Sequence, residues 1–190
     1  MTRVANLRAL GLALALVAAL PACHYEVGYR AVGDAREVAV PIFSNRTLRR
    51  GYEHALTAHL RRRILDQTPL QLAREGSGAP VLEGSIVAVS EALVVPNTND
   101  TAPPRASSIT INVSVVLRSP GAGRGPARIL VGGDRDADGE PDGPAELSET
   151  ETWVPELGQT RDSAADRVLR KLAERIVDLL ERGWGGPQER

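Results

Sequence analysis

Residues 107–118 read SSITINVSVVLR, and apolar side chains alternate with polar ones along this segment. Ile109, Ile111 and Val113 begin the apolar series. Such alternation is typical of a strand with one buried face and one solvated face. The segment therefore predicts a long strand in an antiparallel sheet that is covered on one side only.

Four other segments have the character of strands. They cover residues 36–43, 80–95, 129–131 and 147–154. In the first, alternate residues from Val38 to Ile42 are expected on one side of the strand. Pro41 lacks an amide donor, which indicates a sheet edge or a bulge. In the second, we expect a kink or bulge near Gly84 or Ser90.

Two segments have helical periodicity. Residues 49–67 repeat apolar side chains every four positions, and residues 160–183 carry a wide apolar stripe. Thr160 and Ser163 are candidate N-terminal caps of the second helix, and Gly183 is expected to follow its last turn. The order strand, helix, three strands, helix predicts an α+β fold. We expect a two-layer sandwich of about four mainly antiparallel strands with two helices on one face.

The first 22 residues have the composition of a signal peptide. Arg3 and Arg8 supply positive charge, and an apolar run follows from Leu10 to Leu20. This run is too short to span a bilayer, which requires roughly 20 apolar residues.

Cys23 is the only cysteine of the chain, and only Pro21 and Ala22 separate it from this apolar run. The sequence Leu20-Pro21-Ala22-Cys23 resembles the lipobox of bacterial lipoproteins, in which the cysteine is acylated and becomes the first mature residue. A plain secretory signal with an incidental cysteine is the alternative. An unpaired cysteine in an exported protein calls for a function. We therefore expect lipidation of Cys23 and attachment to the membrane through its acyl chains.

Removal of residues 1–22 would leave 168 of the 190 residues, which suits one domain with its own core. We expect a tether over 23–35, a domain over 36–183 and a tail over 184–190. Loss of Arg3 and Arg8 changes the formal net charge from −1 to −3. This balance argues against a nucleic-acid partner.

The sequence carries no motif of an enzyme or of a cofactor site. Nucleotide-binding glycine loops and the nucleophile motif G-x-S-x-G are absent from it. His54 and His59 are five residues apart, or about 140° around a helix, so they do not form a zinc-binding pair. We expect a protein that is not an enzyme and that holds no cofactor.

An acidic, glycine-rich loop over residues 132–144 resembles the first part of a calcium-binding loop. Asp134, Asp136 and Asp138 are spaced two apart and are followed by Gly139. The bidentate glutamate that closes an EF-hand loop is missing, because Ala145 stands at that position. We therefore expect weak or no calcium binding and no metal site.

The order of several motifs resembles the lipopolysaccharide-assembly lipoprotein family, LptE. The lipobox cysteine is followed by Gly28-Tyr29, and later motifs and the final helix keep the family order. These motifs are Val40-Pro41-Ile42-Phe43-Ser44-Asn45-Arg46-Thr47, Gly51-Tyr52-Glu53 with Leu56-Thr57, and Leu82-Glu83-Gly84-Ser85-Ile86. The loop 132–144 departs from the family pattern.

The resemblance implies a small α+β sandwich that sits inside an outer-membrane β-barrel, LptD. It further implies that the protein helps to assemble the barrel and passes lipopolysaccharide to the cell surface. The expected location is the outer membrane, with the domain facing the periplasm or inside the barrel lumen. The apolar strand followed by Phe43-Ser44-Asn45 also resembles the N-terminal strand of periplasmic lipoproteins that activate peptidoglycan synthases, which is the alternative interpretation.

Three arginines are candidates for contact with lipopolysaccharide. Arg105, Arg118 and Arg124 lie on or beside the loops 96–106 and 119–128, which are expected at one end of the sheet. Guanidinium groups bind phosphates through paired hydrogen bonds, and lipid A carries phosphates. Ordinary solvated arginines are the alternative.

Overall fold

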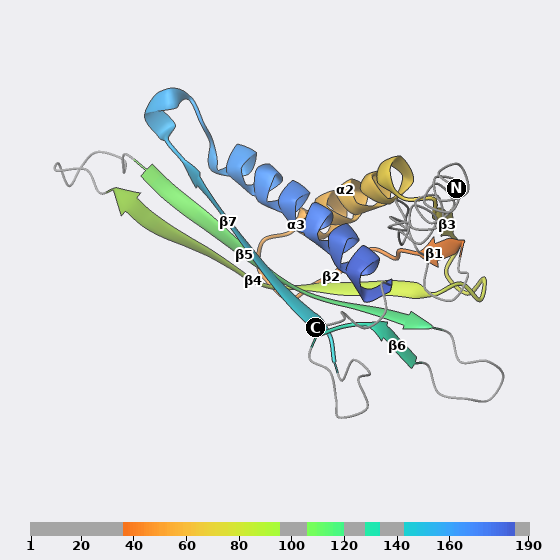
Figure 1. Ribbon diagram of the computed structural model, residues 1–190. Helices are drawn as coiled ribbons and strands as arrows, with labels where there is room; N and C mark the ends of the chain where they lie inside the picture. Colours follow the sequence, from red (N-terminus) through yellow and green to blue (C-terminus); the bar gives the residue numbers. More distant parts are fainter. Residues whose placement is uncertain (1–35, 96–105, 120–127, 134–142, 185–190) are drawn as a thin grey trace, which may run out of the picture.

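The computed structural model describes residues 36–95, 106–119, 128–133 and 143–184. Two helices lie on one side of a seven-stranded sheet (Figure 1). No helix in these described ranges is both long enough and apolar enough to cross a membrane. The elements are β1 (Glu37–Ala39), β2 (Ser44–Asn45), α2 (Tyr52–Gln67), β3 (Gln71–Ala73), β4 (Val81–Val95), β5 (Ala106–Ser119), β6 (Arg128–Val131), β7 (Ala145–Trp153), a 3-10 turn (Pro155–Leu157) and α3 (Arg161–Trp184).

The long strand predicted at 107–118 is the centre of the fold. It forms β5, which pairs antiparallel with β4 on one side and with β7 and β6 on the other. The apolar series from Ile109 to Leu117 is buried against the helices, as the alternation predicted. The expected α+β class and the placement of both helices on one face are confirmed.

The apolar stripes of both helices face the sheet. Leu56, Leu60 and Ile64 of α2 are fully buried, and the buried residues of α3 continue the same core. Thr160 and Ser163 cap α3 reciprocally, because each backbone amide donates to the other residue's hydroxyl at 3.1 Å. The helix extends to Trp184, so the expectation that Gly183 follows its last turn is wrong.

The first predicted strand is interrupted at Pro41. Residues 36–43 do not form one strand: β1 ends at Ala39, and β2 begins at Ser44. The carbonyl of Val40 accepts hydrogen bonds from the Arg61 guanidinium instead of a neighbouring strand, at 2.6 and 3.0 Å. The predicted alternation also fails here, because Ile42 is 54% exposed and Phe43 enters the core in its place.

The sheet is mixed rather than mainly antiparallel over its full width. β1 pairs parallel with β3 and β4, and β2 pairs parallel with β4. The short strand β3 was not predicted. β4 carries a register shift at Val87, between the two positions at which we expected a kink.

Candidate functional site

The motifs that resemble LptE meet at one point in the core, although they are far apart in the sequence. The Phe43 ring lies over Gly84 of β4 so closely that an ideal Cβ at Gly84 would be 2.1 Å from Cε2 of the ring. The backbone amide of Phe43 donates to the buried Thr57 hydroxyl of α2 at 3.1 Å. These three residues, the Phe43 node, join β2, β4 and α2.

A second set of hydrogen bonds fixes the entry into α2. The Asn45 amide donates to the Glu53 carboxylate at 2.6 Å and to the Arg49 carbonyl at 2.7 Å, and its oxygen accepts from Thr47. Glu53 also accepts from the amide of Gly51, which has the left-handed φ of 97°. The hydrogen bond from Asn45 lowers the pKa of the Glu53 carboxyl. The polar groups of this turn therefore hydrogen-bond to one another, and the motif stabilises the fold.

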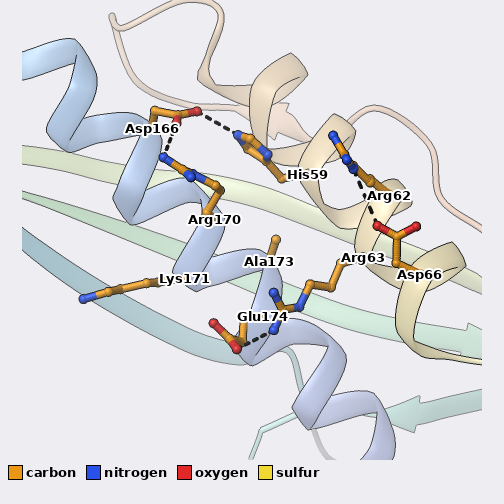
Figure 2. Close-up of a pocket in the computed structure, with 9 residues that line it drawn as sticks. All are labelled: His59, Arg62, Arg63, Asp66, Asp166, Arg170, Lys171, Ala173 and Glu174. Carbon is orange, nitrogen blue, oxygen red and sulfur yellow. Dashed lines mark hydrogen bonds and ion pairs between the residues drawn. The ribbon is translucent and has the colours of Figure 1, made fainter.

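The concave feature between α2 and α3 is a groove of about 470 Å³ (Figure 2). His59 of α2 bonds Asp166 of α3 at 2.8 Å, and Asp166 also pairs with Arg170 at 2.8 Å. Farther along the groove, Arg63 of α2 pairs with Glu174 of α3. These bonds link the two helices across the groove.

The charged side chains of this groove hold α2 and α3 together. Burial alone would raise the pKa of the Asp166 carboxyl, but the hydrogen bond from His59 and the charge of Arg170 outweigh it and lower that pKa. Asp166 and Glu174 are the two carboxylates that α3 contributes to the groove, and both are paired with cations.

A further row of ion pairs connects α3 to β7. The hydrogen bond from Lys171 lowers the pKa of the Glu151 carboxyl. Arg167 and Arg175 also donate to the backbone carbonyls of Thr152 and Ser148, at 3.2 and 2.9 Å. These guanidinium groups occupy carbonyls on the free edge of β7, which limits the pairing of that edge with another strand.

Only one of the predicted lipopolysaccharide-binding arginines lies within the described residues. Arg118, near the end of β5, donates to the Glu83 carboxylate of β4 at 3.1 Å and is partly exposed. Cys23, Arg105 and Arg124 lie outside the described residues, as do residues 134–142 of the acidic loop. Within the described ranges, no group of three metal-ligating side chains is present.

The expectation that both arginine-bearing loops lie at one end of the sheet is wrong. The segment with Arg105 joins β5 at Ala106, and the segment with Arg124 leaves β5 at Ser119. These are opposite ends of a 14-residue strand, which spans about 45 Å at roughly 3.4 Å per residue. Arg105 and Arg124 therefore belong to segments that join β5 at opposite ends.

The sequence profile of the family described as "LptE: Lipopolysaccharide-assembly" matches residues 35–180, which include the Phe43 node, all of α2 and most of α3. The chain belongs to the LptE family. LptE proteins are structural lipoproteins, and this membership confirms that the chain is not an enzyme. Family membership also places the protein in lipopolysaccharide assembly.

Solved structures of several bacterial proteins are similar to this LptE chain. Rare lipoprotein B from Shewanella oneidensis has 12% identity and a TM-score of 0.42, covering 75% of this chain and 91% of that chain. Lipoprotein B from Nitrosomonas europaea has 10% identity and a TM-score of 0.46, covering 82% and 91%. PelC from Paraburkholderia phytofirmans has 13% identity and a TM-score of 0.43, covering 82% and 93%. No curated protein sequence matches the chain.

The contacts of two structurally important side chains were not predicted from the sequence. Thr57 was quoted as a motif residue, but its bond to Phe43 joins segments 14 residues apart. Arg61 caps the Val40 carbonyl from α2, and the sequence gives no sign of this contact. The signal available for Thr57 was a polar residue beside the apolar stripe of a helix, because such a residue requires a buried partner.

Proposed function

We propose that this LptE protein is an outer-membrane lipoprotein that binds and plugs the lipopolysaccharide-transport barrel LptD. It would aid assembly of the barrel and delivery of lipopolysaccharide to the cell surface. The observation that carries the proposal is the family match over residues 35–180. The alternative, activation of a peptidoglycan synthase, has no comparable support.

Anchoring through acylated Cys23 is part of the proposal. The lipobox sequence supports it, and the domain begins soon afterwards, at Arg36. Residues 24–35 connect the two, and twelve extended residues span at most about 40 Å. A lipidated chain would thus hold the domain within that distance of the periplasmic membrane surface, where it can engage a barrel in the same membrane.

Lipopolysaccharide contact by Arg105, Arg118 and Arg124 remains a proposal, now divided between two ends of β5. Arg118 already has a carboxylate partner in Glu83, so binding a phosphate would require it to exchange partners. Arg124 belongs to the segment that leaves the sheet next to Arg118, whereas Arg105 belongs to the opposite end. The two ends are therefore tested separately.

The main test is affinity purification of the full lipidated chain in detergent. We expect a barrel protein several times its mass in the complex, because an enclosed plug buries far more surface than a standard interface of roughly 1,600 Å². Depletion of the lipoprotein from cells should leave the barrel misassembled and the cell surface short of lipopolysaccharide. Recovery of a peptidoglycan synthase without a barrel, together with altered glycan cross-linking on depletion, would contradict the proposal.

Charge reversal separates lipid contact from barrel contact. Arg105→Glu and Arg124→Glu are made singly, and Arg50→Glu, an exposed arginine before α2, is the matched control. Reduced lipopolysaccharide binding with an intact barrel complex would assign the affected end to the lipid. If lipopolysaccharide binding is unchanged in both variants, these arginines are not lipid contacts.

A further inference from the structure

The two faces of the sheet differ sharply in charge. One face is covered by α2 and α3, whose outer surface carries most of the ion pairs found in the described residues. We call the other surface of β4, β5 and β7, which neither of the described helices covers, the open face. The register of the three strands places nine side chains in three rows across it, and none of the nine is charged. They are Ala88, Asn112 and Ser148; Ser90, Thr110 and Thr150; and Ala92, Ser108 and Thr152.

The side chains of the open face are short, and several form hydrogen bonds with one another. The Thr110 and Thr150 hydroxyls are 2.7 Å apart, and the Ser148 hydroxyl donates to the Asn112 side chain at 2.7 Å. Ser148, Thr150 and Thr152 of β7 are nevertheless exposed. Cross-strand bonds hold polar atoms close to the sheet, so the face is less costly to desolvate than one with charged groups.

An uncharged face suits contact with another protein better than a charged face does, because less free energy is lost when it is desolvated. The solvated face of a sheet ordinarily carries charged side chains, which keep the protein soluble and prevent association. Charged residues are depleted at the centre of protein interfaces, and this face shares that one feature with them. The charges of the open face stand at one end only, at Glu83, Arg118 and Glu146.

The size of the open face favours an enclosing partner over a second copy of this chain. The stretch shared by the three strands is set by β7, which has nine residues. At about 4.8 Å between strands and about 3.4 Å per residue, this stretch covers about 400 Å². A standard interface takes roughly 800 Å² from each partner, so this face alone is too small for a stable dimer. A concave partner that also touches the edges of the sheet would supply the missing area. The inner wall of a β-barrel is concave and polar, and it is built of strands.

We propose that the open face of β4, β5 and β7 is the surface of this protein that packs against the inner wall of its barrel partner. The charged helical face, with the groove between α2 and α3, is then directed into the lumen. This orientation rests on the proposed function. The contact is made by short hydroxyl, amide and methyl groups, which allow the two sheets to approach closely.

Site-specific photocrosslinking of the full lipidated chain in cells tests the orientation. A photoreactive amino acid is placed at Thr150 and Ser90 on the open face, and at Arg62 and Gln67 on the helical face. We expect adducts with the barrel from the open face that exceed those from the helical face at least fivefold. Barrel adducts mainly from the helical face would overturn the orientation while leaving the proposed function intact. Adducts between two copies would also overturn it, whereas loss of all barrel adducts and of co-purification would refute both proposals.

A charge placed on the open face gives an independent test. Thr150→Lys should reduce the barrel recovered with the protein at least tenfold, because the charge would be buried at the contact. Gln67→Lys, which adds the same charge to an exposed position of α2, should leave recovery unchanged. Thr150→Ser should behave as wild type, and an unchanged urea midpoint of the Thr150→Lys variant excludes misfolding. Normal recovery with correctly folded Thr150→Lys would overturn the inference.

Discussion

Replacing Gly84 with alanine tests the Phe43 node. The added methyl carbon would lie 2.1 Å from Cε2 and 2.5 Å from Cζ of Phe43, whereas carbon atoms at contact are about 3.5–4.0 Å apart. The ring has little freedom to move, because Phe43 is 2% exposed and its amide is bound to Thr57. Overpacking typically costs about 1–3 kcal/mol, and an overlap of this size places Gly84→Ala near about 3 kcal/mol.

Urea unfolding of the mature chain carrying Cys23→Ala measures this cost. With a slope of about 2 kcal/mol per molar urea, the midpoint should fall by about 1.5 M. Gly143→Ala is the matched control, because a methyl group there meets nothing within 4 Å. That control should change stability by less than about 0.5 kcal/mol.

A double-mutant cycle separates the overlap from any general strain in β4. Phe43→Ala alone should cost about 3–5 kcal/mol through the cavity it leaves. In that background the methyl group of Gly84→Ala occupies vacated space, so the pair should cost at least about 1 kcal/mol less than the sum of the single changes. Strict additivity, or a midpoint for Gly84→Ala within 0.2 M of wild type, would refute the reasoning about the node.

Four other expectations concern the anchor, the groove and the acidic loop. Intact-mass analysis of membrane-extracted protein should show loss of residues 1–22 and acyl chains on Cys23; a free thiol there would contradict this. Without its signal, the Cys23→Ala chain should remain soluble after a high-salt wash, and persistence in the membrane fraction would reveal an overlooked membrane-binding surface. Because the folded-state pKa of Asp166 is lowered, its stabilising effect is present at neutral pH and is lost as the pH falls below about 4, so urea titrations should show a flatter acid limb for Asp166→Asn than for wild type. Calorimetry should detect weak or no calcium binding, and micromolar affinity abolished by Asp136→Asn with Asp138→Asn would show a metal site.

The features that follow from periodicity were predictable. The alternation over 107–118 and the stripe of α3 each extend over several repeats, so the buried face of each was assigned correctly. β3 spans only Gln71–Ala73 and is formed by parallel pairing with β1, which is distant in sequence. Three residues contain too few repeats to show a period, and the pairing depends on the tertiary fold.

The location of the loops was predictable but was missed. Consecutive antiparallel strands reverse direction, so the connections before and after β5 must leave the sheet at opposite ends. The switch from Ile42 to Phe43 as the buried residue was harder to foresee. It depends on Arg61 of a helix that begins 11 residues beyond Pro41 and occupies the Val40 carbonyl.

The Phe43 node bears on how LptE proteins diverge. Phe43, Thr57 and Gly84 lie within the matched residues 35–180 and hold β4 and α2 together, a role that does not depend on what the protein binds. The outward surfaces, such as the open face, are under no such architectural constraint and are free to change together with the partner. Specificity for a partner should therefore be transferable between distant relatives by grafting surface residues onto an unaltered scaffold.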